Sequence, residues 1–91
     1  AAQGYADAQF NLGQMMRSGR GAKADEQEGL RLIKLAADNG SAAAQYSLGN
    51  MYRAGSGVKR DVAEAARLYK LAAAQGHSEA RASLATLEAR H

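Results

Sequence analysis

The stretch RSGRGAKAD, residues 17–25, holds the residue types that could bind an anion. Two glycines flank an arginine, a lysine follows, and an aspartate closes the run. The backbone N–H groups of a glycine-rich turn can surround a phosphate, and the same cations could contact the backbone of a nucleic acid. A turn between two helices is the third interpretation, and the rest of the sequence favours this one.

Other side chains capable of chemistry are few and scattered. His77 and His91 are the two histidines, and the absence of cysteine excludes disulfides and thiolate metal sites. The sequence contains no HExxH, GxSxG or Walker A motif. No serine stands at a spacing from a histidine that suggests a nucleophile and its base, and capping or surface roles suit Ser18, Ser41 and Ser78 better. We therefore predict a protein that is not an enzyme and that holds no metal ion and no cofactor.

Composition favours helices and a single domain. The 91 residues include 46% hydrophobic but only 5% aromatic residues, and they lack proline and tryptophan. The net charge of +3 comes from 12 basic and 9 acidic residues that are interleaved, which is typical of solvated helix faces. No apolar run approaches the roughly 20 residues that span a bilayer, so we expect no direct insertion into a membrane.

An internal repeat organises the chain. Gly4, Gly40 and Gly76 stand at an even step of 36 residues, and residues 4–39 align with residues 40–75 without a gap, at about half identical positions. RSGRGAKAD then matches RAGSGVKRD, which keeps both glycines and the aspartate but has Ser56 in place of Arg20. The opening stretch is therefore predicted to be a repeated turn between helices.

The repeat gives the expected domain organisation. Residues 1–3 match the end of a preceding unit, residues 4–39 are repeat 1, residues 40–75 are repeat 2, and residues 76–91 are a half repeat. The half repeat supplies one capping helix over Ser78 to Ala89. Because the chain opens on AAQG without a methionine, we expect it to be a piece of a larger protein.

Each unit is predicted to form two helices. The first carries an apolar stripe, and its interior glycine, Gly13 or Gly49, indicates close approach of two backbones. The second begins at a capping box, Asp25 with Glu28 or Asp61 with Glu64, and ends at a glycine. Stacked pairs of this kind make an all-α, right-handed α-solenoid of about five helices. The stripes are Ala8, Leu12, Met15 and Met16 with Ala44, Leu48, Met51 and Tyr52 in the first helices, and Leu32, Ile33 and Ala36 with Leu68, Tyr69 and Ala72 in the second.

The two units resemble Sel1-like repeats, relatives of the tetratricopeptide repeats. The second unit carries the pattern best, with Ala44, Leu48, Gly49, Tyr52, Gly55, Gly57-Val58, Asp61, Ala65, Tyr69, Lys70, Ala72-Ala73 and Gly76. Met16 departs from the family's tyrosine, Gly29 from its alanine and Ala85 from its glycine. Ala85 indicates that no further helix packs closely there. In the family, a histidine at the position of His77 serves local packing.

The resemblance implies a function class. Sel1-like repeat proteins are mostly non-catalytic scaffolds and adaptors that assemble other proteins, and bacterial members recur in cell-envelope, polarity and host-interaction systems. The parent protein is accordingly expected to be a larger bacterial envelope, polarity or signalling protein. The resemblance further implies a periplasmic or cell-envelope location for the parent protein, and a cytoplasmic location stays open.

First helices line the concave surface of such a solenoid, so we expect a peptide or protein segment to bind there. Polar residues opposite the stripe vary between units while the framework is kept. Phe10 and Tyr46 flank the stripe, are expected to be partly exposed, and could anchor the partner. The predicted partner-binding residues are Asp7, Phe10, Asn11, Gln14, Tyr46, Ser47, Asn50, Ser83 and Thr86.

Two alternatives remain at this level. The basic residues Arg17, Arg20, Lys23, Arg53, Lys59 and Arg60 cluster near the interhelix loops and could form a ridge that binds nucleic acid weakly. The neighbouring Asp25 and Asp61, and the lack of interleaved aromatics, count against it. Self-association through an uncovered N-terminal face is the other alternative.

Overall fold

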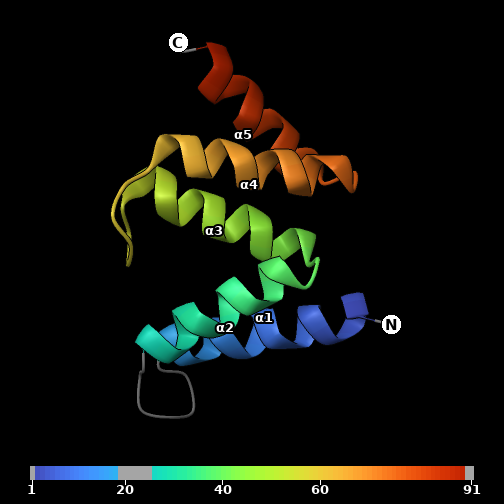
Figure 1. Ribbon diagram of the computed structural model, residues 1–91, viewed down its shortest axis with the longest axis vertical. Helices are drawn as coiled ribbons and strands as arrows, with labels where there is room; N and C mark the ends of the chain where they lie inside the picture. The colour runs from blue at the N-terminus through green and yellow to red at the C-terminus, as the bar shows by residue number, and fades with distance from the viewer. Residues whose placement is uncertain (1, 19–25, 90–91) are drawn as a thin grey trace.

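Five α-helices make up the part of the chain that the computed structural model describes, residues 2–18 and 26–89 (Figure 1). They form a helical solenoid, and no strand occurs within these ranges, so the predicted all-α class is confirmed. The helices are α1 (Ala2–Ser18), α2 (Glu26–Asp38), α3 (Ala42–Ala54), α4 (Val62–Ala74) and α5 (Ser78–Ala89).

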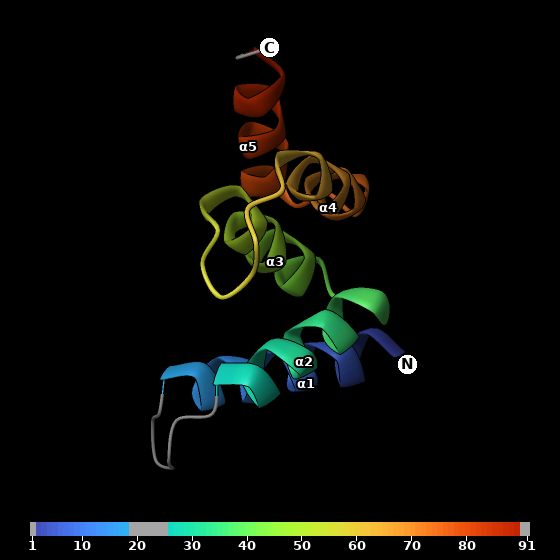
Figure 2. The same cartoon turned by 60° about the vertical axis from the view of Figure 1, so that its left-hand side comes forward.

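The helices stack mainly in chain order. α1 packs on α2, α2 on α3, α3 on α4 and α4 on α5, while α1 and α3 also touch. Figure 2 shows α5 standing across the end of the α3–α4 pair, far from α1. The resulting body measures 40 × 30 × 16 Å. Because the helices pack in a stack, each helix pair is stabilised by its neighbours.

Two apolar clusters hold the stack together. The first joins Phe10 of α1, Ile33 of α2, Leu48 of α3 and Leu68 of α4. The second surrounds Tyr69 of α4 and includes Ala80 and Leu87 of α5. Alanines fill much of the remaining contact area in both clusters, which lets the helix axes approach closely, as the composition predicts.

The interior glycines mark the closest of these approaches. A Cβ atom built on Gly13 would lie 2.8 Å from the backbone oxygen of Gly29, and one on Gly49 would lie 2.8 Å from Cε1 of Tyr69. Both distances are shorter than carbon atoms tolerate. The close backbone approach predicted for these glycines is confirmed at Gly13, whereas Gly49 makes room for the ring of Tyr69.

Helix ends follow the predicted signals in part. Asp61 caps α4, because its carboxylate accepts a 3.0 Å hydrogen bond from the Glu64 N–H. Gly40 and Gly76 close α2 and α4 with φ of +98° and +87°. The capping box also predicts a hydrogen bond from the Asp61 N–H to the Glu64 carboxylate, and this part of the prediction is wrong. Glu64 pairs with Arg67 instead, and the Asp61 N–H donates to the carbonyl oxygen of Tyr52.

The turn of repeat 2, RAGSGVKRD at residues 53–61, has the expected geometry. Gly55 and Gly57 adopt φ of +74° and +79°, in the left-handed region that favours glycine. Gly19, Gly21 and Asp25, their counterparts in repeat 1, lie outside the described residues.

Paired amides recur at one edge of the stack, at the start of each α2–α3 or α4–α5 turn. The side chain of Asn39 donates a 2.9 Å hydrogen bond to Gln9, and that of Gln75 donates at 3.1 Å to Gln45. Gln75 also donates to the backbone oxygen of Gly40 at 2.9 Å. These bonds join equivalent positions of the two units, so they fix the same edge of each helix pair.

The predicted stripe of the first helix is right in α3 but wrong in α1. Leu48 and Met51 are 4% and 6% exposed, whereas Leu12 and Met15 are 49% and 51% exposed. Ala8 is exposed and Met16 is half-buried. The reason is a missing neighbour: α2 covers this face of α3, while no described helix covers the matching face of α1. Met15 is therefore not the core residue that its spacing indicates.

The inward face of α1 is the opposite one. Ala6, Phe10 and Gly13 are buried there, and Phe10 is only 8% exposed, which corrects the expectation that its ring is partly exposed. Residues two apart on a helix point about 200° away from each other, so burial of Phe10 directs Leu12 to the surface. Sequence spacing alone shows both faces as apolar.

Candidate functional site

A shallow groove of about 270 Å³ runs between α1 and α3. Gln14 of α1 and Ser47 and Asn50 of α3 line it, and all three were predicted to contact a partner. Ile33 and Met51 contribute the apolar part of its lining. The groove therefore offers three short polar side chains around an apolar floor, an arrangement that suits an extended peptide backbone.

Tyr69 of α4 holds the side chain of Asn50 in place. The Tyr69 hydroxyl donates a hydrogen bond to the side-chain oxygen of Asn50. Burial raises the pKa of Tyr69 above its usual value, and the nearby Arg53 and Ser83 oppose that shift only in part. The phenol stays a neutral donor near pH 7. This bond orients the Asn50 amide and leaves its N–H₂ group and the second lone pair of its oxygen available to a ligand.

Arg17 extends from the end of α1 into the same groove. A Cβ atom built on Gly29 would lie 2.5 Å from Cγ of Arg17, so the missing side chain at Gly29 makes room for the arginine. One guanidinium nitrogen lies 3.6 Å from the position that a Cβ of Gly57 would take. Sequence reasoning placed Arg17 on a basic ridge and missed this place in the groove. The departure of Gly29 from alanine was the available signal.

The remaining predicted partner-binding residues lie outside this groove. Asp7 is exposed on α1 and accepts a 2.8 Å hydrogen bond from the Ser41 hydroxyl. The Thr86 hydroxyl donates to its own helix, at Ala82. Phe10 lies in the core. Asn11 is exposed, and Ser83 is half-buried beside the Tyr69 hydroxyl.

Tyr46 and His77 form a small ring cluster with Tyr69. The centroid of the Tyr46 ring lies 4.8 Å from that of His77 and 5.9 Å from that of Tyr69. His77 Nδ1 also accepts a 3.1 Å hydrogen bond from the Ala80 N–H at the start of α5. The packing role expected for His77 is confirmed, while Tyr46 is half-buried and keeps an exposed part.

Basic residues that the structure describes are divided between two hollows of the surface. Arg17 lines the groove, while Lys59 and Arg60 line a separate cleft beside α2. Arg60 donates from Nε to the backbone oxygen of Arg53 at 3.1 Å. Arg20 and Lys23 lie outside the described ranges.

Residues 2–18 and 26–89 contain no group of three or more histidine, aspartate or glutamate side chains placed to hold a metal ion. Over the same ranges, no helix is both long and apolar enough to cross a membrane.

Stacked helix pairs with a fixed 36-residue step define a class of helical-repeat proteins, and comparison with known families identifies which one. The Sel1 repeat model matches residues 6–41 and 42–77. The chain therefore belongs to the Sel1 repeat family, whose members are generally protein–protein interaction modules. A comparison with curated proteins gave no match.

Two solved structures are similar to this chain. A Sel1 repeat protein from Oxalobacter formigenes shares 35% identity at a TM-score of 0.84, over 87% of this chain and 59% of its own length. The protective antigen c5321 of uropathogenic Escherichia coli, with an SLR fold, shares 40% identity at a TM-score of 0.78. That match covers 89% of this chain but 17% of the antigen. The chain thus spans less than two thirds of either relative.

Proposed function

We propose that this chain is a non-catalytic scaffold that binds an extended peptide or protein segment in the groove between α1 and α3. The observation that carries the proposal is the convergence of Gln14, Ser47 and Asn50 on one cavity with an apolar floor. Amide and hydroxyl groups can pair with the donors and acceptors of a peptide backbone. Family membership supports the interaction role. A role in a bacterial envelope, polarity or signalling system, and a periplasmic location, remain predictions.

Selected peptides can test the groove. A phage-displayed library of random peptides would be selected on the immobilised chain, and the best binder titrated while amide shifts are recorded. We expect shifts along α1 and α3 around Gln14 and Asn50. Shifts confined to residues 26–38 and 62–74, the second helices, would count against the proposal.

Variants give the quantitative version of that test. Asn50→Ala and Gln14→Ala each remove one hydrogen-bonding group and should weaken the selected peptide by about threefold to tenfold. Lys70→Ala, which changes an exposed side chain on α4, is the matched control and should bind like the parent chain. Equal affinities for all three variants would contradict the groove as the binding site.

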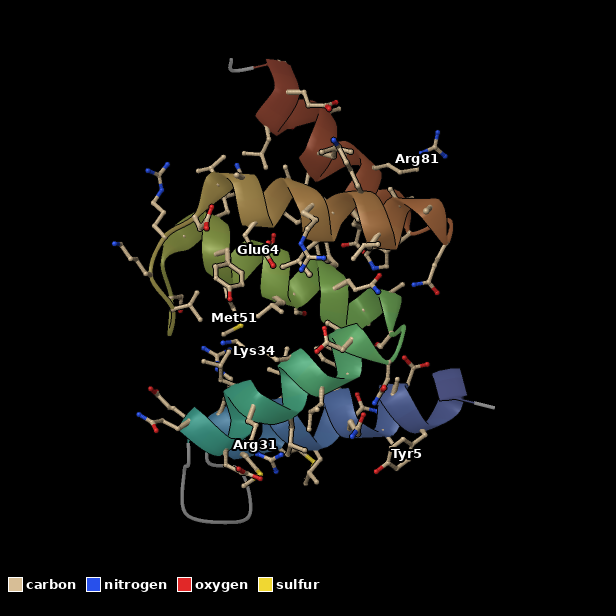
Figure 3. The ribbon with its side chains drawn as sticks, in the orientation of Figure 1. Tyr5, Arg31, Lys34, Met51, Glu64 and Arg81 are labelled. Atoms are coloured by element: carbon tan, nitrogen blue, oxygen red, sulfur yellow. The ribbon has the colours of Figure 1, made fainter. Side chains whose placement is uncertain are left out.

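Self-association is a second candidate, favoured by the uncovered face of α1. Tyr5 is 66% exposed and projects away from the other helices (Figure 3). Leu12 is 49% exposed and stands seven residues later in α1, so it lies on the same side of that helix. Exposed apolar patches of this kind drive association. Light scattering against concentration should show a growing mass that Leu12→Ser abolishes. Leu71→Ser, at an exposed leucine of α4, should leave the association unchanged; a constant monomer mass in the parent chain would exclude this candidate.

A further inference from the structure

A second, larger cleft of about 520 Å³ lies between α2 and the loop that joins α3 to α4. Figure 3 shows Lys34 on the side of α2 that faces α3, next to this space. No residue lines both this cleft and the groove between α1 and α3. The cleft is lined by Leu30, Lys34, Tyr52, Gly57, Val58, Lys59, Arg60 and Asp61.

The floor of the cleft is apolar. Leu30, Tyr52 and Val58 are half-buried, and each packs against the first core cluster with part of its side chain still exposed. A ligand side chain that covered the exposed part would gain hydrophobic free energy in proportion to the apolar area buried. An aliphatic side chain is the complementary shape, because the floor combines two branched aliphatic residues with one ring.

The rim is basic and its charges are unmatched. Lys34, Lys59 and Arg60 are exposed, and no ion pair within the described ranges includes them; those pairs are Arg31–Glu28 and Arg67–Glu64. Asp61 is the one acid of the lining, and its carboxylate already caps α4. The cleft therefore presents three cations and one carboxylate around an apolar floor, so positive charge is in excess.

The wall formed by residues 55–61 is fixed by the backbone. The Gly55 N–H donates to Met51 at 2.7 Å, and the Asp61 N–H donates to Tyr52 at 2.9 Å. The Arg60 side chain is also tied to the oxygen of Arg53. These bonds hold both ends of the loop against α3, so the backbone that carries Lys59 and Arg60 is fixed before a ligand arrives, which reduces the entropic cost of binding.

We propose that this cleft binds a short acidic peptide segment, with an aliphatic side chain over Leu30, Tyr52 and Val58 and flanking carboxylates paired with Lys34 and Lys59. The site is separate from the groove of the proposed function and goes beyond it. Nucleic acid fits the same cations less well, because the cleft offers one half-buried aromatic ring instead of a stacking surface.

Matched labelled peptides can test both parts of the recognition. The probe is a short fluorescent peptide with a Glu-Leu-Glu core between Gly-Ser flanks, measured by anisotropy at low and physiological salt. A Gln-Leu-Gln peptide removes the charge, and a Glu-Ser-Glu peptide removes the aliphatic anchor. We expect the parent peptide to bind at least about fivefold more tightly than either. Equal binding by all three peptides would overturn the proposal.

Charge-matched variants of the protein locate the site. The double variant Lys34→Glu, Lys59→Glu should weaken the Glu-Leu-Glu peptide by about tenfold or more. The control Lys70→Glu, Arg81→Glu changes the net charge by the same amount at exposed positions of α4 and α5 outside the cleft, and should weaken it by less than about twofold. Equal losses in both double variants would show non-specific attraction and overturn the proposal. Circular dichroism would confirm that both variants are folded.

The remaining outcomes are also decisive. A single-stranded oligonucleotide that binds more tightly than the peptide, and loses affinity in the Lys34→Glu, Lys59→Glu variant, would replace the peptide with nucleic acid as the occupant and overturn the proposal. The groove between α1 and α3 serves as an independent check: Asn50→Ala should leave the Glu-Leu-Glu affinity unchanged. A loss in Asn50→Ala equal to that in the cleft variant would assign this peptide to the groove instead.

Discussion

Repeats 1 and 2 place the same residue types at the same spacing, yet they use them differently. Leu48 of α3 is 4% exposed, because it packs among residues of α2 and α4. Leu12 of α1, at the equivalent position, is 49% exposed. The difference comes from the neighbour that each helix has. In a solenoid, burial belongs to the interface between units, so an apolar stripe becomes core only where another helix pair covers it.

Leucine-to-alanine changes should show this difference in burial between the two repeats most clearly. Leu48→Ala removes a buried side chain and leaves a cavity, so we expect it to lower the free energy of unfolding by about 3 kcal/mol. Leu12→Ala should cost less than about 0.5 kcal/mol, because its side chain is already half in water. Urea unfolding followed by circular dichroism measures both. Equal losses would mean that the face of α1 is covered in solution.

Glycine-to-alanine changes on α1 give the next largest effect. Gly13→Ala forces a Cβ to within 2.8 Å of the Gly29 backbone oxygen, so we expect a loss of about 2 kcal/mol. Gly4→Ala is the matched control in the same helix, since no atom lies within 4 Å of the added Cβ. It should stabilise the helix by up to about 1 kcal/mol. The same unfolding measurement serves, and a stabilising Gly13→Ala would contradict the close approach of α1 and α2.

Tyr69 carries a buried hydroxyl group that its repeat partner Ile33 lacks, and removing this hydroxyl should have a moderate effect. Tyr69→Phe loses the bond to Asn50 and should cost about 1 kcal/mol at neutral pH. Burial raises the Tyr69 pKa above 10.0, so the folded state favours the neutral phenol. Its contribution is complete below pH 10 and is lost as the pH rises from there through the folded pKa.

Alkaline unfolding curves would check that sign. The parent chain should lose stability above about pH 10 more steeply than Tyr69→Phe. Tyr5→Phe, at a ring that is largely exposed, is the control and should follow the parent. Parallel curves for all three chains would show that Tyr69 is not protected by burial.

The salt bridges on the second helices should contribute least in both units. Arg31 lowers the pKa of Glu28 and Arg67 lowers that of Glu64, mainly through side-chain hydrogen bonds. A lowered pKa means stability that is present above the unfolded value and lost as the pH falls through the folded value. Because water screens such pairs, Glu64→Gln should cost only about 0.3 kcal/mol at pH 7. Acid titration of the thermal midpoint would measure it, and a loss as large as that of Leu48→Ala would refute this estimate.

The sequence predicts local features of this fold well. The 36-residue step, the helix Ser78–Ala89, the Asp61 cap and the closing glycines depend on residues near one another in the chain, and all appear as expected. Packing that depends on the neighbouring unit was harder. The exposure of Leu12, the burial of Phe10 and the room that Gly29 makes for Arg17 each require a three-dimensional neighbour.

The candidate groove was predicted in part for the same reason. Gln14, Ser47 and Asn50 were found from variation between equivalent positions, and they do meet. Asp7 and Thr86 obey the same spacing but bond to Ser41 and Ala82. The cleft beside α2 was missed, because its floor is assembled from three separate segments and has no continuous signature.

The paired amides have a mechanical consequence for the whole stack. Asn39 with Gln9, and Gln75 with Gln45, tie each helix pair at the edge where one unit passes into the next. The cleft opens at the opposite edge, beside residues 57–61. Side-chain amide hydrogen bonds thus join the helices along one edge of the stack, while the cleft lies at the other edge. Because the side-chain amides hold the ends of the helices at one edge, we expect any opening between α2 and α3 to begin at the other edge, beside the cleft.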